Sequence, residues 1–497
     1  MKRLVIFSTA LIVMILILIV FKFVDYPSIS NLFIIPHQKY ESIEINPYYK
    51  DRISIELIAE GLSLPTSMTF VGNNSILVLE KDLGNVRLIT DDVLQKDPIY
   101  TIQNISNEKE QGLLGIAALD MSKVPKEFQF DNHDLLNLPN SENNFANTSS
   151  SFITPTNNDS TFKIYLYVTE KGVITSSGYT NTTNHYLNDT THNRVYEYNW
   201  NGPGGGNLSS PSLLLDLPSG PDPYHNGGKM HIDRQGNMYI IIGDLVTINN
   251  TLQNYPGGKN KSISTPNNSS VIIRINPLHE SMIPTNNPFY LYYNNDTILQ
   301  SMKLYYSYGI RNGFGLDTDP ITGKLWNTEN GENRYDEINL VEPGSNSGWN
   351  KIMGPFNRGN NTLLSDLVLL NGSHYSDPEF SWRYPVGVTD IEFLESSNLG
   401  KDLENNIFVG DINNGNVYLF KVNSNRTGID IQKSVSTSEN VKGLQDLVAD
   451  NKSELEKIIF AKNFSGRITD IETGMDGSMY ILTYFDGKVY KISPIEK

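Results

Sequence analysis

The sequence repeats one two-strand pattern six times between residues 75 and 492. In each repeat a short run of β-branched and aromatic residues leads through a turn into a second apolar run, often introduced by glycine. The repeats cover residues 75–89, 163–200, 237–277, 324–344, 406–422 and 478–492. Since one such sheet cannot bury both of its faces alone, repeats of this kind stack radially around a central channel. The pattern therefore predicts an all-β fold, a six-bladed β-propeller of four-stranded antiparallel blades.

The pattern also divides the chain into three segments. Residues 1–24 are a candidate signal anchor or signal peptide, residues 25–51 are a Pro- and Asn-bearing tether, and residues 52–497 are the propeller domain. The strand that begins at Ile53 has no obvious partner nearby in the sequence, so we expect it to complete the last blade and close the ring. Two stretches rich in Asn, Ser and Thr, residues 125–160 and 176–192, are predicted loop insertions.

The N-terminal segment predicts export from the cytoplasm. Lys2 and Arg3 precede an apolar run over residues 4–21, whose length approaches that needed to cross a hydrocarbon core. No small-x-small cleavage site follows the run, so the sequence favours an uncleaved signal anchor over a cleaved signal peptide. In both cases the rest of the chain is extracytoplasmic, either anchored to the cell membrane by this segment or secreted.

Charge and cysteine content exclude two classes of site. With 39 basic and 55 acidic residues the net charge is −16, which argues against a nucleic-acid partner because phosphate binding needs a basic surface. The chain has no Cys, so any metal must be bound by oxygen or His ligands, and Ca²⁺ is the natural candidate. About seventeen Asn-x-Ser/Thr sequons indicate either a glycoprotein or simply an Asn-rich composition.

A histidine and an aspartate flank one predicted hairpin. His225 precedes a Gly-Gly turn at the start of one strand, and Asp244 ends the strand that returns after Gly236. Since the beginning of one antiparallel strand lies beside the end of the next, the two side chains are expected to meet. A carboxylate beside an imidazole fixes its tautomer and stabilises the imidazolium, so the pair is a candidate general base. The alternative is a structural His before a glycine turn.

A second polar segment follows, from Tyr306 to Trp349. Arg311 and Asn312 lie next to glycine at the start of a strand, where they can offer a guanidinium fork and an amide to an anionic or carbonyl-bearing ligand. The run from Glu329 to Asn339 is rich in oxygen ligands, and Gly331 lets backbone carbonyls turn toward a cation. An ordinary Asn- and Asp-rich surface loop is the alternative.

Taken together, these segments resemble the PQQ-dependent soluble glucose and aldose sugar dehydrogenases, the glucose/sorbosone dehydrogenase family. The resemblance spans roughly residues 53–493 and is carried by six segments in order. They are residues 65–70 (Pro-x-x-Met-x-Phe), 110–117 (Glu-Gln-Gly-Leu-Leu-Gly-Ile-Ala), 225–244, 311–349, 409–418 (Val-Gly-Asp through Gly-Asn-Val-Tyr) and 466–477.

The resemblance implies roles for particular residues. His225 would be the general base that takes the proton from the anomeric hydroxyl of an aldose, supported by Asp244, while hydride passes to pyrroloquinoline quinone (PQQ). Arg311 would hydrogen-bond the reactive quinone carbonyl and Asn312 would help to hold the cofactor. The backbone carbonyls of Gly331 and Glu332 stand where the family binds Ca²⁺; a carbonyl ligand makes the departure from Pro at position 332 tolerable.

Other positions depart from the glucose enzymes of the family. Where they have a cofactor-contacting Gln, the simplest alignment places Glu110, with Gln111 next to it as the candidate contact. Asn413 replaces a Lys that pairs with a cofactor carboxylate, and of two terminal Arg residues Arg467 remains while Thr469 replaces the second. Each missing cation removes a charge-assisted contact worth about 1.5–3 kcal/mol, which concerns cofactor binding rather than the fold.

Three functions are compatible with these residues. The favoured one is an extracytoplasmic quinoprotein oxidoreductase that converts aldose sugars to lactones and delivers electrons to an unknown acceptor, either the quinone pool or a small redox protein. A calcium-dependent propeller lactonase would need several carboxylates converging on one axial metal, instead of the His-Asp and Arg-Asn pairs expected here. The third function is a non-catalytic surface propeller that has lost the cofactor and binds carbohydrate or protein.

Overall fold

The computed structural model describes residues 42–72, 74–124, 162–172, 191–204, 206–246, 251–254, 267–279, 281–292, 300–358, 362–434 and 441–495. The chain divides into two compact units, Met1–Ser42 and Ile43–Lys497. The predicted anchor, most of the tether and nearly all of the two predicted insertions lie outside the described residues. Within the part that is described, no helix has the length and apolar character needed to cross a membrane.

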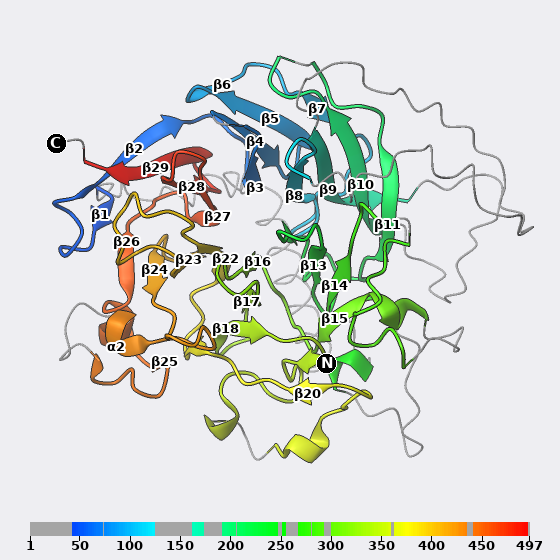
Figure 1. The fold of residues 1–497 in the computed structure, drawn as a ribbon, viewed down its shortest axis with the longest axis vertical. Helices are drawn as coiled ribbons and strands as arrows, with labels where there is room; N and C mark the ends of the chain where they lie inside the picture. Colours follow the sequence, from blue (N-terminus) through cyan, green and yellow to red (C-terminus); the bar gives the residue numbers. More distant parts are fainter. Residues whose placement is uncertain are drawn as a thin grey trace, which may run out of the picture. The chain divides into compact units, whose positions relative to one another are not determined.

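The described strands of the Ile43–Lys497 unit pair into six sheets (Figure 1). One contains β3 (Pro65–Phe70), β4 (Ser75–Glu80), β5 (Asn85–Thr90), β6 (Val93–Leu94) and β7 (Tyr100–Thr101). The next contains β8 (Leu113–Asp120), β9 (Phe162–Lys171), β10 (Thr191–Trp200) and β11 (Ser212–Pro218). A third contains β12 (Met230–Ile232), β13 (Met238–Ile242), β14 (Val271–Ile275), β15 (Tyr305–Tyr308), β19 (Ser345–Asn346) and β20 (His374–Tyr375).

The other three sheets come from the second half of the chain and from its first strands. One contains β16 (Gly315–Thr318), β17 (Leu325–Glu329), β18 (Asp336–Val341), β21 (Phe380–Trp382) and β25 (Val448–Ala449). Another contains β22 (Val388–Phe393), β23 (Ile407–Asp411), β24 (Val417–Phe420), β26 (Ile459–Lys462) and β1 (Glu44–Ile45). The last contains β27 (Ile468–Thr473), β28 (Met479–Thr483), β29 (Lys488–Pro494) and β2 (Ile53–Ala59).

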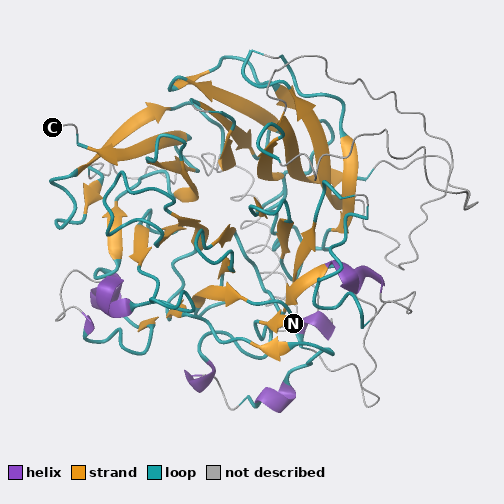
Figure 2. Cartoon of the chain, in the orientation of Figure 1, coloured by secondary structure: helices purple, strands orange, loops and turns teal. Residues whose placement is uncertain are grey.

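Helices contribute little to the described fold (Figure 2). The α-helices α2 (Ile431–Ser434) and α3 (Lys452–Leu455) are four residues long each. The 3₁₀ turns are η4 (Thr251–Gln253), η5 (Gln300–Leu304), η6 (Phe356–Arg358) and η7 (Leu364–Asp366). The described part of the chain is thus all-β, as the sequence predicts for the propeller.

Each of the six predicted strand pairs forms the second and third strands, counted from the centre of the ring, of a different sheet, for example β4 with β5 and β28 with β29. The prediction of four-stranded antiparallel sheets is wrong for four of the six described sheets, which have five or six strands, and β19, β20 and β25 pair in parallel at outer edges. The innermost strands contact one another in the order β3, β8, β12, β16, β22, β27 and back to β3, which closes the sheets into a ring. The fold is therefore a β-propeller, and these strands surround the axis of the ring, a region called the central channel below (Figure 1).

The ring is closed by strands from the two ends of the domain. β2 pairs antiparallel with β29, with Ile53 opposite Pro494 and Ile55 opposite Ile492. The prediction that the strand from Ile53 completes the last sheet is confirmed.

The hydrophobic core lies between neighbouring sheets, because each sheet packs on both of its faces. One cluster joins Trp326 and Phe380 of the β16–β18 sheet to Tyr418 and Phe420 of the next sheet along the ring. Five further clusters fill the other interfaces between neighbouring sheets in the same way. Burying apolar area on both faces of every sheet rigidifies the strand ends that carry the polar side chains described below.

Candidate active site

His225 and Asp244 meet at one end of the β12–β13 hairpin. His225 lies in the segment that leads into β12, and Asp244 follows β13. Their side chains are joined by a hydrogen bond of 2.6 Å between Nδ1 of His225 and Oδ1 of Asp244. The contact that antiparallel pairing predicts from the sequence is therefore present.

The surroundings of Asp244 fix the tautomer of His225. Oδ1 of Asp244 also accepts the backbone N–H of Val246 at 2.9 Å, and Oδ2 accepts the indole N–H of Trp349 at 2.8 Å. With N–H donors on both oxygens, the carboxylate acts as an acceptor, so the proton of the shared bond belongs to Nδ1 of His225. The lone pair of the imidazole is then on Nε2, for which the described residues provide no hydrogen-bond partner.

The His225 backbone takes a conformation that few non-glycine residues adopt. Its φ is 61°, in the left-handed region, and its N–H donates to Oε2 of Glu110 at 2.7 Å. The turn that follows presses on β13: a Cβ on Gly227 would come within 2.3 Å of the Ile241 carbonyl oxygen. Only glycine fits that approach, which explains the Gly-Gly pair after His225.

Arg311 lies beside this pair because its backbone is bonded to the Asp244 backbone. The carbonyl oxygen of Arg311 accepts the N–H of Asp244 at 2.8 Å. The guanidinium Nη1 donates to the carbonyl oxygens of Asn330 and Gly331 at 2.9 and 3.1 Å, and the group stands over the Trp349 ring at 5.4 Å. Its Nε is buried and has no partner in the described part of the chain.

Asn312 is buried beside Arg311, and it is bonded to Glu110. Its Nδ2 donates to Oε2 of Glu110 at 3.2 Å, whereas its Oδ1 is buried without a partner among the described groups. The neighbouring Gln111 turns away from the site: its side chain accepts the hydroxyl of Ser106 at 2.7 Å and donates to Ser219 at 3.3 Å. Of the two adjacent residues, it is Glu110 that meets His225 and Asn312.

Gly331 lies in a tight loop between β17 and β18. Its N–H donates to Oδ1 of Asp336 at 2.9 Å, and a Cβ there would come within 1.9 Å of the Arg334 carbonyl oxygen. The second oxygen of Asp336 accepts backbone N–H groups of the 386–388 segment, and burial raises the pKa of this carboxyl against the effect of those donors. Glu332, the other predicted calcium ligand, is exposed in the same loop.

Glu329 is a buried carboxyl at this site that the sequence reasoning did not single out. Its Oε1 accepts the Arg311 N–H at 2.6 Å, and its Oε2 is buried with no partner among the described residues. Burial raises the pKa of Glu329 to about 8, against the lowering effect of Arg311.

The remaining predicted cofactor contact, Arg467, and the two substituted positions, Asn413 and Thr469, are not bonded to this cluster. Arg467 precedes β27 with a φ of 65°, and its backbone N–H donates to Phe464. No described residue joins its side chain to His225 or Arg311. Thr469 donates its hydroxyl to the Pro65 carbonyl oxygen at 3.1 Å, and Asn413 is exposed.

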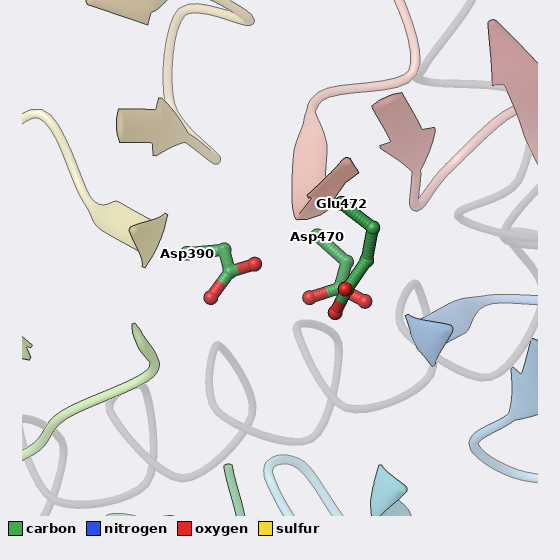
Figure 3. A group of neighbouring side chains, drawn as sticks. All are labelled: Asp390, Asp470 and Glu472. Carbon is green, nitrogen blue, oxygen red and sulfur yellow. The ribbon is translucent and has the colours of Figure 1, made fainter. Parts of the chain in front are cut away.

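A second polar cluster lies in the central channel, and the sequence analysis missed it. Nζ of Lys229, just before β12, lies 2.9 Å from Asp390 on β22 and 2.6 Å from Asp470 on β27. Glu472 completes a group of three carboxylates whose oxygens lie within 4.8 Å of one another (Figure 3). Since β27 stands opposite β12 in the ring, the Lys229 side chain reaches across the channel.

This channel cluster, defined as Lys229, Asp390, Asp470 and Glu472, corrects the expectation that no carboxylates converge on the axis. They do converge, but around an ammonium group that occupies the place a metal ion would need. Burial acts to lower the pKa of Lys229, yet attraction by Asp390 and Asp470 raises it well above the usual value. The cluster therefore carries its own cation, and it does not favour the lactonase alternative.

A pocket adjoins the channel cluster and is lined by Lys229 and Glu472 of that cluster together with His231, Asp317, Glu392 and other residues. Burial lowers the pKa of His231 to about 3 and raises that of Asp317 to about 7. Nδ1 of His231 lies 3.3 Å from Asp317, and its Nε2 lies 2.9 Å from the Thr318 hydroxyl. Unlike His225, this histidine has partners at both ring nitrogens, so it fits a structural role.

Comparison with known proteins identifies relatives of the chain. The Glucose / Sorbosone dehydrogenase family matches residues 164–491, well over half of the sequence. Aldose sugar dehydrogenase YliI of Escherichia coli is 26% identical over 290 residues, 57% of this chain and 64% of that protein. An uncharacterized protein of Synechocystis, slr1608, is 22% identical over 442 residues, 89% of this chain and 86% of the relative.

Solved structures show the same fold. The soluble aldose sugar dehydrogenase of Escherichia coli, in its apo form, superposes with a TM-score of 0.58 at 18% identity, covering 89% of this chain and 99% of that one. The PQQ-bound aldose sugar dehydrogenase of Streptomyces coelicolor gives a TM-score of 0.55 at 18% identity, covering 89% and 98%. With the family match over residues 164–491, these findings show that the chain belongs to the glucose/sorbosone dehydrogenase family.

Proposed function

We propose that this protein is an extracytoplasmic quinoprotein that oxidises aldose sugars at the anomeric carbon to lactones, with each of the six sheets serving as one blade. The observation that carries the proposal is the His225–Asp244 pair, joined at 2.6 Å and connected through Trp349 to the Arg311 guanidinium. A base and a cation side by side suit a reaction that removes a proton from a hydroxyl and transfers a hydride from the adjoining carbon.

The base is Nε2 of His225. It takes the proton of the anomeric hydroxyl, and the imidazolium that forms is stabilised by Asp244 through the Nδ1–H hydrogen bond. Asp244 keeps its own negative charge in this step, because its oxygens already accept N–H groups from Val246 and Trp349. The pair therefore orients one proton acceptor toward the substrate.

The residues around Arg311 fit PQQ, a planar tricarboxylate with quinone carbonyls. Arg311 has a buried Nε without a protein partner, and Asn312 has a buried Oδ1 without one among the described groups, so a donor and an acceptor remain for a ligand. Bound there, PQQ would supply the hydride acceptor. Arg311 would hold a quinone carbonyl, Arg467 would pair with a carboxylate, and Glu110, in place of Gln111, would face the cofactor.

A calcium ion would be bound by the carbonyl oxygens of Gly331 and Glu332. The Gly331 carbonyl already accepts the Arg311 guanidinium at 3.1 Å, so it faces the site and suits a positively charged group. Asp336 holds the loop in this shape through the Gly331 N–H. Carbonyl oxygens are ligands that Ca²⁺ prefers, and the ion would add positive charge beside Arg311.

We further propose that residues 1–24 anchor the protein to the cell membrane and that the tether predicted at residues 25–51, of which Glu44–Ile45 pair with β26 inside the Ile43–Lys497 unit, holds the propeller outside it. Sugar would then be oxidised outside the cytoplasm, and electrons would pass to the quinone pool or to a small redox protein. The apolar run over residues 4–21 supports this placement.

The test is titration of the full chain with PQQ and Ca²⁺, followed by dye-linked oxidation of a panel of aldoses. Saturable oxidation that requires both additions supports the proposal. The alternative, a surface propeller that binds carbohydrate or protein without cofactor, is favoured by the exposed Asn413 and by Thr469, which leave the cofactor two cations short. It would be established by sugar binding in the absence of any PQQ binding or turnover.

A further inference from the structure

Trp349 touches both halves of the site. Its indole Nε1–H donates to Oδ2 of Asp244 at 2.8 Å, and its ring carries the Arg311 guanidinium at 5.4 Å from the centroid. We propose that Trp349 is a positioning residue that couples the His225–Asp244 pair to Arg311. This inference rests on the function proposed above.

The indole donor controls the orientation of the carboxylate. An indole N–H can only donate, so it requires an acceptor at Oδ2 of Asp244 and leaves Oδ1 for His225 and Val246. A carboxylate fixed at both oxygens cannot rotate about its Cβ–Cγ bond. The imidazole plane is fixed in turn, and Nε2 keeps one direction.

The Trp349 backbone is itself held firmly. Its N–H donates to the Gly309 carbonyl oxygen at 3.1 Å, and its carbonyl oxygen accepts Nδ2 of Asn254 at 2.8 Å. The preceding Gly348 has a φ of 100°, and a Cβ there would come within 2.9 Å of Ile352. Such a loop sets the indole position before any ligand binds, as a positioning residue requires.

The ring face acts on Arg311 separately from the indole N–H. A guanidinium within about 6 Å of an indole centroid is attracted to the face of the ring. Since Nη1 of Arg311 is already bonded to the carbonyl oxygens of Asn330 and Gly331, the ring fixes the remaining freedom of the guanidinium plane. The indole donor of Trp349 can therefore be removed while an aromatic ring face is kept.

The experiment compares Trp349→Phe, which deletes the donor and keeps a ring, with Trp349→Leu, which deletes both. Trp326→Phe is the matched control, because the Trp326 indole N–H is buried with no hydrogen-bond partner in the described part of the chain. Trp349→Phe should lower kcat by about tenfold, the worth of one hydrogen bond to a charged group, with PQQ affinity and sugar KM within about twofold of wild type. Trp349→Leu should in addition weaken PQQ affinity, and Trp326→Phe should leave kcat unchanged in the folded protein.

The pH profile gives a readout that a merely structural role would not move. Loss of the indole donor leaves more negative charge on Asp244, which favours the protonated imidazole, so the acid limb of kcat/KM should move to higher pH in Trp349→Phe. The Trp326→Phe profile should superpose on that of wild type. An unshifted acid limb in Trp349→Phe, with kcat unchanged, would overturn the inference.

A measurement without cofactor separates this inference from the proposed function. In the ¹⁵N-histidine NMR spectrum of the full chain, His225, assigned with His225→Ala, should show the Nδ1–H tautomer in wild type and in Trp349→Phe, but its Nδ1–H proton should exchange faster with water in Trp349→Phe, because the carboxylate that accepts it is free to rotate. If wild type oxidises no aldose, the proposed function fails while this result still tests Trp349. Equal exchange rates of this proton in the two proteins would show that Trp349 does not position the pair.

Discussion

Two polar groups, the mouth of the site around His225 and the channel cluster around Lys229, each place a carboxylate 2.6 Å from a basic nitrogen. They differ in how many of their hydrogen-bonding atoms have partners. In the mouth, defined as His225, Asp244, Arg311 and Asn312, Nε2 of the imidazole, Nε of the guanidinium and Oδ1 of the amide have no hydrogen-bond partner in the described part. In the channel cluster the Lys229 ammonium is shared among carboxylates of two strands. Unused hydrogen-bonding capacity indicates a place for a ligand, whereas a cation surrounded by carboxylates indicates a place for stability.

The largest expected effect is a loss of turnover without a loss of stability when His225 in the mouth is replaced. His225→Ala should lower turnover by about two to four orders of magnitude, the usual worth of a positioned general base. The melting temperature and PQQ affinity should stay close to those of wild type, because His225 precedes β12 and takes no part in the clusters between sheets. Steady-state kinetics with calorimetry measures both quantities. Full turnover in this variant would move the base to another residue of the channel.

In the channel cluster we expect a substitution to lower the stability of the fold and to leave turnover almost unchanged. Lys229→Met leaves Asp390 and Asp470 buried without their cation, and breaking a buried ion pair costs about 3–5 kcal/mol. The free energy of unfolding should fall by that order, while kcat of the protein that remains folded changes little. Urea unfolding with activity measured on the same sample tests this. A stable but inactive Lys229→Met protein would mean that the two regions are not separate in function.

A smaller effect is expected from Arg311→Lys. A point charge cannot reproduce the planar donor fork or the stacking on Trp349, so turnover should fall by roughly tenfold with no loss of stability. Arg426→Lys is the matched control, because Arg426 makes a comparable fork to Asp319 away from the site. Equal kcat in Arg311→Lys and wild type would remove Arg311 from the reaction.

The smallest expected effect is the pH dependence of stability. Burial raises the pKa of Glu472 from 4.5 to about 8 against the pull of Lys229. Between those values the folded protein retains a proton that the unfolded chain releases, so this contribution to stability is present at low pH and is lost as the pH rises toward about 8. In Glu472→Gln the free energy of unfolding, measured by urea denaturation, should decline less between pH 4.5 and about 8 than it does in wild type. A wild-type stability that rises with pH there would contradict the assignment.

The predictable part of the molecule is the part encoded locally. Strand pairs such as residues 478–492 show the alternation of apolar and polar residues within about fifteen residues. His225 meets Asp244 because both lie at one end of the same hairpin. The channel cluster could not be predicted in this way, since it joins position 229 to positions 390 and 470 on strands across the ring. The choice between Glu110 and Gln111 was equally hidden, because neighbouring side chains point in different directions and only the fold shows which one faces the site.

The pairing of β2 with β29 has a consequence for biosynthesis. Ser54 and Ser493, which contact each other across these strands, are 439 residues apart in sequence. The entropy of closing so long a loop grows only with the logarithm of its length, but closure cannot begin until the final strand has been synthesised. During translation the ring is therefore an open arc with β2 unpaired, and we expect chaperone binding and protease sensitivity to concentrate on β2 until β29 has been synthesised.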